Sequence, residues 1–199
     1  MDMTYCISEA AERNKAPILR VLSVELAQAT RVLEIGSGTG QHAVYFAAHL
    51  PQLTWQPTDT GDYLPGLRER VAREGGDNVL APLPLDVRDR TWPAGEFNAV
   101  YSANALHIMS WACVLEFFRG VGEVLEKPGV LCLYGPFRYG GRYTSDSNAA
   151  FDEFLRGRDP DSGIRDVQAL RELAARQGLR PSADHPMPAN NQLLVFRNG

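Results

Sequence analysis

The sequence has few cysteines, and their placement does not suggest covalent cross-links. Its 199 residues include three cysteines, Cys6, Cys113 and Cys132, which are an odd number without close pairing or metal-ligand spacing. A disulfide framework and a zinc site are therefore disfavoured, and a reducing compartment is favoured. A chain of this length with 44% hydrophobic residues can bury a full core, so we expect one domain over residues 1–199 and no metal centre.

The sequence is also poor in segments that direct a chain to a membrane. The first nine residues have neither a basic region nor an apolar run, so we expect no secretory signal and a cytoplasmic location. Residues 97–115 contain no Asp, Glu, Lys or Arg, but polar residues interrupt the run, which favours a strand and a helix start over a membrane span. These polar residues are Asn98, Ser102, Asn104, His107 and Ser110.

An excess of positive charge is missing as well. The formal net charge is −4, which disfavours a basic footprint for DNA or RNA, although a local basic patch is compatible with a negative total. A small molecule is therefore the expected partner.

What the sequence does contain is a glycine-rich turn between a short apolar run and a helix. Residues 32–35 predict a buried parallel strand, and residues 41–50 predict a helix that Pro51 stops. The glycines between them permit positive φ and let a ligand lie against the backbone. A strand, a tight turn and a helix N-terminus together predict a cradle for a nucleotide. The predicted contact residues of this turn are Gly36, Ser37, Gly38 and Gly40.

The residues around the glycines distinguish between two classes of nucleotide. The dinucleotide pattern G-x-G-x-x-G would place its last glycine at position 41, where this chain has Gln41. Instead, Glu34 precedes a G-x-G-x-G, and this arrangement resembles the first motif of the class I S-adenosylmethionine-dependent methyltransferases. A carboxylate suits a ligand that carries an ammonium and a sulfonium group. Glu34 either serves the methionine end of that ligand or braces the turn, and the two roles are compatible.

Two further acids follow predicted strands. Asp59 ends the strand over 53–58, at the distance from the glycines where a βαβ unit places the acid that binds ribose hydroxyls, and Asp62 is a rival for this role. Asp86 follows a third strand over 79–85, whose prolines indicate an edge position. By the resemblance, Asp86 and the apolar Val87 contact the adenine. The alternative for each acid is an ordinary turn or capping role.

Polar residues also follow the fourth predicted strand, over 97–102. Asn104 and His107 lie where an open α/β sheet presents its substrate. His107 is either a general base or a hydrogen-bonded core residue among apolar neighbours. The resemblance described below places Asn104 next to the cofactor.

The loop predicted over 135–143, after a fifth strand over 130–134, combines glycine, tyrosine and arginine. Arg138 and Tyr139 are candidate groups for the methyl acceptor, and residues 136–163 are a candidate lid on the substrate side. The alternative is a surface loop with ordinary charges.

The N-terminal 28 residues predict an apolar-faced helix over 8–28 with Pro17 near its start. The polar stretch 12–15 is either a solvated helix start or part of a flap over 1–28 that contributes Arg13, Asn14 or Lys15 to the site. Further helices are predicted over 63–74, 114–125, 147–157 and after an Asp166 cap, and a terminal strand pair over 179–188 and 193–196.

This alternation resembles the class I methyltransferase fold over most of the chain. The expected fold is α/β, a Rossmann-like seven-stranded and mostly parallel sheet with helices on both faces and an antiparallel last strand. Four short motifs resemble more narrowly an uncharacterised methyltransferase-like subgroup, and this resemblance raises the weight of Asn14 and Asn104 as site residues. The motifs are Glu-Arg-Asn-Lys at 12–15, Gly-Ser-Gly-Thr-Gly-Gln-His at 36–42, Ser-Ala-Asn-Ala-Leu-His at 102–107 and Tyr-Gly-Pro-Phe at 134–137.

The function expected from these residues is methyl transfer from S-adenosylmethionine to a small soluble acceptor. In-line displacement depends mainly on alignment in a dry site, so a dedicated base is optional. One alternative is a module that binds S-adenosylmethionine to regulate a partner without turnover. Another is a nicotinamide-dependent oxidoreductase, which Gln41 disfavours.

Overall fold

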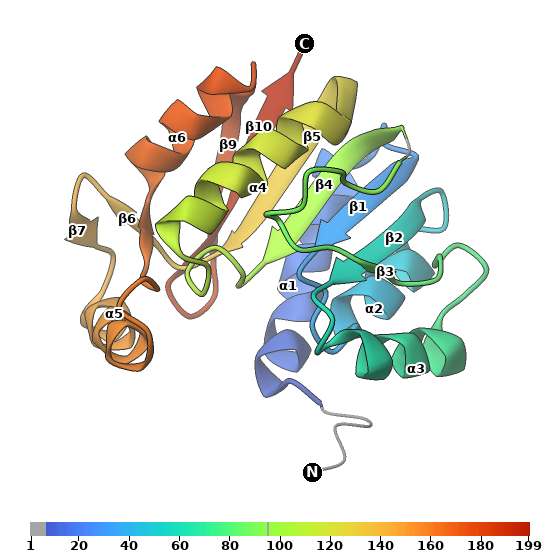
Figure 1. The fold of residues 1–199 in the computed structure, drawn as a ribbon, viewed down its shortest axis with the longest axis horizontal. Coiled ribbons are helices and arrows are strands. Elements are labelled where there is room, and N and C mark those ends of the chain that lie inside the picture. The colour runs from blue at the N-terminus through green and yellow to red at the C-terminus, as the bar shows by residue number, and fades with distance from the viewer. Residues whose placement is uncertain (1–6, 95) are drawn as a thin grey trace.

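The centre of the molecule is a seven-stranded sheet in the order β3-β2-β1-β4-β5-β10-β9 (Figure 1). This computed structural model describes residues 7–94 and 96–199, so Cys6 and most of the stretch considered for a leader lie outside the described residues. The first five strands pair in parallel, and β10 is antiparallel to both β5 and β9, which confirms the predicted fold class. The strands are β1 (Arg31–Ile35), β2 (Thr54–Asp59), β3 (Leu83–Pro84), β4 (Phe97–Ala103), β5 (Leu125–Gly135), β9 (Arg180–Met187) and β10 (Asn191–Asn198).

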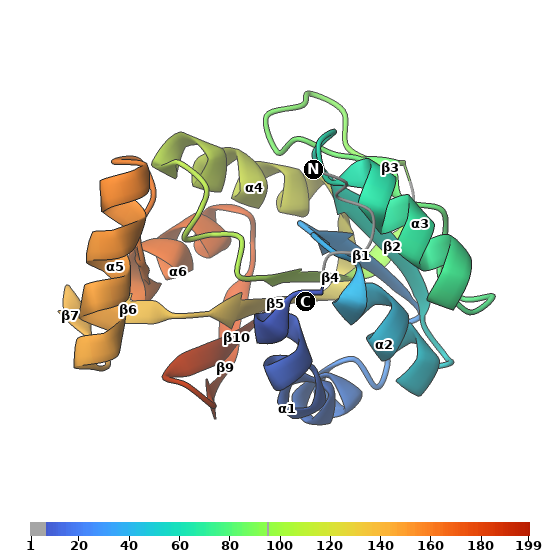
Figure 2. The same cartoon turned by 90° about the horizontal axis from the view of Figure 1, so that it is seen from below.

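Helices cover both faces of this sheet (Figure 2). Side chains alternate along β1, so Val32 packs with α1 and α2 on one face, whereas Leu33 packs with α4 and α6 on the other. Asp166 caps α6 as predicted, since its carboxylate accepts a hydrogen bond from the Gln168 N–H. The helices are α1 (Glu9–Glu25), α2 (Gln41–His49), α3 (Leu64–Glu74), α4 (Trp111–Val124), α5 (Asp146–Arg158) and α6 (Val167–Arg176).

The start of α1 differs from the prediction. Pro17 lies well inside the helix instead of near its start, because Ser8 caps the helix by accepting a hydrogen bond from the Ala11 N–H. The polar stretch 12–15 therefore belongs to the first two turns of α1, and Asn14 is one of the buried residues of this helix.

The third strand is much shorter than predicted. Only Leu83 and Pro84 pair with β2, and Val79 forms a single bridge to Trp55. Proline has no N–H to donate to a ladder, so Pro82 and Pro84 interrupt the predicted strand over 79–85. The edge position expected for these prolines is confirmed.

The predicted loop over 135–143 is mostly a β-hairpin. Strands β6 (Phe137–Tyr139) and β7 (Arg142–Tyr143) are antiparallel and joined by Gly140 and Gly141, which both have positive φ. Strand β8 (Arg165–Asp166) pairs with β6 and completes a second, three-stranded sheet. Helix α5 lies beside this small sheet, outside the main layers (Figures 1 and 2).

Candidate functional site

The glycine turn after β1 is fixed to the end of β2. The backbone N–H groups of Gly36 and Ser37 both donate to the Thr58 carbonyl, at 3.1 and 2.9 Å. Gly36 has a φ of 76°, and a Cβ atom at this position would lie 3.3 Å from the Cβ of Ala105. The turn therefore passes close to the segment after β4, where a larger residue would not fit without displacement.

Glu34 lies beneath this turn. Its carboxylate accepts hydrogen bonds from the Trp55 indole N–H and the Ser37 hydroxyl, both at 2.9 Å. Burial raises the pKa of Glu34 to about 7, although both hydrogen bonds act in the opposite direction. Of the two roles considered for Glu34, the structure shows the brace of the turn, and a direct contact with the ligand stays a prediction.

Asp59 connects the glycine turn to the end of β2. Its carboxylate accepts hydrogen bonds from the N–H groups of Gly38 at 2.6 Å and Thr60 at 2.7 Å. Burial raises its pKa, whereas these hydrogen bonds act to lower it. Each carboxylate oxygen retains a lone pair after one such bond, so Asp59 can also accept from a bound hydroxyl. The rival acid, Asp62, is exposed.

A pocket of about 310 Å³ lies at the carboxyl ends of the first four strands. It is lined by five of the residues that the sequence analysis predicted for the cofactor: Gly36, Asp59, Asp86, Val87 and Asn104. This is the edge of an open α/β sheet where ligands bind. Further lining residues, which sequence reasoning missed, are Tyr63, Arg88, Ile108, Met109 and Cys113.

Asp86 is paired with one of these missed residues. The Arg88 guanidinium donates to both oxygens of Asp86, with the shortest contact at 2.5 Å. Arg88 lowers the pKa of Asp86, so this carboxylate is ionised at neutral pH. The only sequence signal for Arg88 is its position two residues after the acid.

A second cavity of about 820 Å³ adjoins the pocket, because Asn104 and Ile108 line both. Its wall comes from α1, the segment after β4, the end of β5, α5 and the turn between β9 and β10. The lining residues include Asn14, His107, Tyr134, Asn148 and Asn191. Two predicted residues from distant parts of the chain, Asn14 and His107, thus meet at one cavity.

His107 lies at this cavity as a neutral imidazole. Burial, and secondly the charge of Arg165, lower its pKa to about 4. Its ring makes an edge-on contact with Phe151, with 5.4 Å between the ring centroids. A neutral imidazole has one nitrogen that can accept a proton, but a pKa of about 4 makes His107 a weak base at neutral pH. Its role as a general base stays a prediction.

Asn14 is held in place from the core. Its side-chain oxygen is 2.7 Å from Nε2 of His42, whose Nδ1 is 3.3 Å from the Tyr101 hydroxyl. Burial lowers the pKa of His42 to about 4, so this ring is also neutral and has one N–H. An amide oxygen only accepts, so Nε2 carries the proton and Tyr101 donates to Nδ1.

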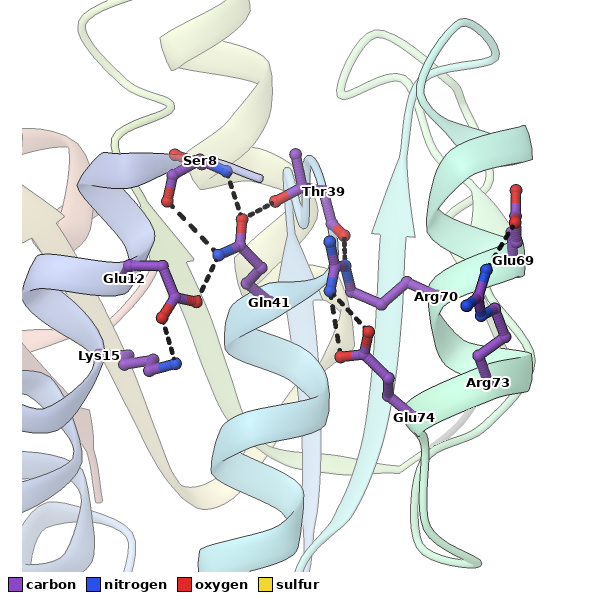
Figure 3. Close-up of polar contacts among 9 residues, drawn as sticks. All are labelled: Ser8, Glu12, Lys15, Thr39, Gln41, Glu69, Arg70, Arg73 and Glu74. Atoms are coloured by element: carbon purple, nitrogen blue, oxygen red, sulfur yellow. Dashed lines mark hydrogen bonds and ion pairs between the residues drawn. The ribbon is translucent and has the colours of Figure 1, made fainter. Parts of the chain in front are cut away.

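Gln41 fastens the start of α1 to the glycine turn (Figure 3). Its side-chain oxygen accepts from the Ser8 N–H at 2.5 Å and the Thr39 hydroxyl at 2.8 Å, and its amide donates to Glu12 at 2.5 Å. In the sequence analysis Gln41 served only to disfavour a dinucleotide, and no pattern in the sequence indicates this contact. The residue links the turn of the smaller pocket to the helix that lines the larger cavity.

Helix α3 holds the same turn from the opposite side. Arg70, which is buried, donates to the Thr39 carbonyl at 2.6 Å and is paired with Glu74 (Figure 3). At Gly40 a Cβ atom would lie 2.7 Å from the Leu67 side chain. The turn is therefore fixed by both flanking helices as well as by β2.

The segment that carries Asn104 and His107 is held by Arg165. Its guanidinium donates to the carbonyls of Leu106 at 3.0 Å and Met109. Burial lowers the pKa of Arg165. Sequence reasoning missed this residue because it follows a charged stretch that reads as a linker.

Arg138 and Tyr139, the other two candidates for the acceptor, line neither of these two cavities. The Tyr139 hydroxyl donates to Asp184 on β9 at 2.9 Å, and the Arg138 guanidinium lies 5.5 Å from the centre of the Tyr143 ring. Strand β6 carries both residues away from the pocket. Their role at the acceptor stays a prediction.

Residues 7–94 and 96–199 contain neither a membrane-spanning helix nor a cluster of metal ligands. None of the helices there has the length and apolar character needed to cross a membrane. The same residues contain no group of three or more His, Cys, Asp or Glu side chains placed to hold a metal ion.

The sheet order and the site at the glycine turn define a Rossmann-like domain with the class I methyltransferase fold. An O-methyltransferase family protein from Burkholderia thailandensis superimposes with a TM-score of 0.83 and 19% identity, over 96% of this chain and 58% of that one. Mitomycin 7-O-methyltransferase MmcR superimposes with a TM-score of 0.81 and 17% identity, over 96% of this chain and 54% of that one. For the S-adenosylmethionine-dependent methyltransferase SibL the TM-score is 0.79 and the identity 21%, over 95% of this chain and 55% of that one. The chain thus spans little more than half of the length of these proteins.

Within that fold class the family is also defined. The model of the family described as "Protein of unknown function (DUF938)" matches residues 5–198, and the chain belongs to this family.

Proposed function

We propose that the chain binds S-adenosylmethionine in the pocket at the glycine turn and transfers its methyl group to a small molecule in the adjoining cavity. One observation carries this proposal. Gly36, Asp59, Asp86 and Asn104 lie at the carboxyl ends of four different strands and line a single pocket, which shares Asn104 with a larger cavity. A cofactor pocket beside a separate acceptor cavity is the arrangement that a group transfer needs.

The chemistry of the pocket fits this ligand. Gly36 leaves room for a ligand against the backbone, Asp59 has lone pairs for ribose hydroxyls, and the ionised Asp86 can accept from the adenine amine. Asn104, with a φ of 55°, would bind the methionine end. The bound cofactor supplies a methyl group on a positively charged sulfonium.

The remaining contributions come from side chains of the chain itself. Ile108 lines both cavities and would keep water from the methyl group, and Arg165 fixes the segment that carries it. His107 is neutral and would accept a hydrogen bond from the acceptor if the acceptor atom is a hydroxyl. Glu34 would act through the turn that it braces.

Calorimetry with S-adenosylmethionine, S-adenosylhomocysteine and NAD tests the cofactor. We expect the two adenosyl ligands to bind with dissociation constants on the order of 10 μM, and NAD not to bind. Binding of NAD alone would contradict the proposal and favour the nicotinamide-dependent oxidoreductase.

Turnover needs a second experiment. The protein is incubated with methyl-labelled S-adenosylmethionine and fractionated cell extract, and we expect label in a small-molecule fraction. Binding of the cofactor without labelled product in any fraction would favour the alternative, a module that binds S-adenosylmethionine and regulates a partner.

A further inference from the structure

The larger cavity has a composition that indicates what it binds. We infer that it takes an uncharged, ring-bearing small molecule, and that the hydroxyl of Tyr134 hydrogen-bonds to the polar edge of this molecule. The inference rests on the proposed function in one respect, since it takes the occupant to be the methyl acceptor.

The size and position of the cavity suit such an occupant. Its volume of about 820 Å³ lies within the range of pockets for small molecules. Ile108 and Phe151 supply apolar walls, and Pro136 and Pro188 add to them. Because Asn104 lines both cavities, one end of the occupant would lie next to the cofactor.

The lining is almost free of charge. The described residues that line the cavity include no Asp, Glu or Lys, and Arg13 is their only charged side chain. Arg13 is 72% exposed and lies 3.4 Å from Glu9, so it is directed to solvent and already has a partner. His107 is neutral. A buried ammonium or carboxylate would therefore lose its hydration without gaining a counter-charge, which is strongly unfavourable.

The polar groups of the lining are amides and hydroxyls with fixed neighbours. Asn148 is buried, and its amide donates to the Thr144 hydroxyl at 2.8 Å and the Asn190 carbonyl at 2.9 Å. Asn14 is held by His42. Such groups discriminate by hydrogen bonding and not by charge, because an amide presents both an acceptor and donors.

Tyr134 is the phenol of the lining. Its side chain is buried to all but 4%, and it lines the cavity together with Asn14. Tyr101 donates to His42 and His42 donates to Asn14, so this neighbour is fixed from the core. Burial raises the pKa of Tyr134, whereas hydrogen bonds with Asn14 and Asn191 lower it. A phenol hydroxyl both donates and accepts, so Tyr134 can hydrogen-bond to the polar edge of a neutral ligand.

Three motifs of the sequence meet in this chain of contacts. His42 ends the glycine motif, Asn14 comes from the motif at 12–15, and Tyr134 begins the motif at 134–137. None of these side chains lines the smaller pocket. The larger cavity is where this network reaches a ligand site, because Asn14 and Tyr134 line that cavity.

Three probes that share a benzene ring but differ in charge test the inference: one is neutral, one is an anion and one is a cation. Benzamide, benzoate and benzylammonium are titrated by ligand-observed NMR into the full chain with saturating S-adenosylhomocysteine. We expect benzamide to bind with a dissociation constant on the order of 1 mM, and the two ions at least about tenfold more weakly. Equal or tighter binding of either ion, or no binding of benzamide at about 20 mM, would overturn the inference.

Two variants test whether the probe binds in the larger cavity. Tyr134→Phe should weaken benzamide about fivefold, whereas Tyr45→Phe, which removes a hydroxyl on α2 outside the cavity, should not. Ala189→Asp adds a carboxylate to the rim at a left-handed position, with a φ of 57°, that Asp tolerates well. It should tighten benzylammonium about threefold and weaken benzoate. If Tyr134→Phe does not fold, the Ala189→Asp result decides, and an unchanged charge preference would overturn the inference.

The experiments distinguish a failure of the proposed function from a failure of the inference about the cavity. If S-adenosylhomocysteine does not bind but the charge series behaves as expected without it, the proposed function is wrong and the preference of the cavity stands. If S-adenosylhomocysteine binds and benzoate is preferred to benzamide, the proposed function stands and the inference is wrong.

Discussion

The two cavities that meet at Asn104 have opposite chemistry. The smaller pocket has carboxylates in its lining, Asp59 and Asp86, whereas amides and hydroxyls line the larger cavity. In the smaller pocket Arg88 lowers the pKa of Asp86, whereas burial raises the pKa of Asp59, and at the larger cavity burial keeps His107 neutral. Carboxylates accept from hydroxyls and amines, so the smaller pocket suits a nucleoside, and the larger cavity suits a neutral ligand.

The two cavities also differ in how the chain forms them. The smaller pocket uses the first residues after β1, β2, β3 and β4, and the parallel sheet alone brings these positions to one edge. The larger cavity needs α1, α5 and the turn between β9 and β10, which lie far apart in the sequence. The smaller pocket therefore depends on the sheet, and the larger cavity depends on the elements that pack around the sheet.

The largest effect is expected at Asp59, where a substitution would weaken binding in the smaller pocket and leave binding in the larger cavity unchanged. Asp59→Ala removes the proposed acceptor for the ribose hydroxyls and the hydrogen bond from the Gly38 N–H, so the affinity for S-adenosylhomocysteine should fall about 100-fold. Calorimetry measures this loss, and NMR should show unchanged affinity for benzamide.

Asp62→Ala is the matched control, because this acid is exposed and lies outside the pocket. Its affinity for S-adenosylhomocysteine should equal that of the wild type. A larger loss with Asp62→Ala than with Asp59→Ala would assign the ribose to the rival acid.

The difference between the cavities explains how much could be predicted from sequence. Asp59, Asp86 and Asn104 could be placed at one pocket because each follows an apolar run, and parallel strands end at the same edge. The fold class followed from the same alternation of strands and helices. Spacing along the chain was sufficient information for this half of the site.

The other half depends on contacts that leave no pattern in the sequence. Tyr134 reads as the end of a buried strand, yet it lines the larger cavity, and Arg165 follows a charged stretch, yet it holds the segment that carries His107. Arg138 and Tyr139 were placed at the acceptor because the loop was expected to leave the sheet edge toward it. In the structure β6 pairs with β7 and β8, so these side chains belong to the small sheet, and their role at the acceptor stays a prediction.

A change of pH should test the neutrality of the larger cavity, with a smaller effect. The pKa of His107 falls from its ordinary 6.5 to about 4 on folding, so the unfolded chain binds this proton first. The resulting stability is fully present above pH 6.5 and is lost as the pH falls toward 4. At about pH 5 the loss from this residue amounts to about 2 kcal/mol.

The variant His107→Gln cannot take up this proton. Urea unfolding at pH 7 and pH 5 should therefore show a smaller decrease in the free energy of unfolding for the variant than for the wild type. His42 titrates in the same window and in the same direction in both proteins, so the difference between them isolates His107. Equal decreases would mean that His107 is not held neutral.

The smallest effect is expected at Gln41, which connects the two cavities. Gln41→Ala removes the hydrogen bonds to Ser8, Thr39 and Glu12, which should lower the free energy of unfolding by about 1 to 2 kcal/mol and speed amide exchange in the first turns of α1 (Figure 3). Arg73→Ala, which removes a 3.4 Å exposed ion pair with Glu69, is the control and should cost about 0.5 kcal/mol or less.

The loss of Gln41 should also affect the two ligands differently. Gln41 lines neither cavity, and the helix that it holds, α1, lines only the larger one. Gln41→Ala should therefore weaken the binding of benzamide more than the binding of S-adenosylhomocysteine. Equal losses for the two ligands would mean that the glycine turn, and not α1, depends on Gln41.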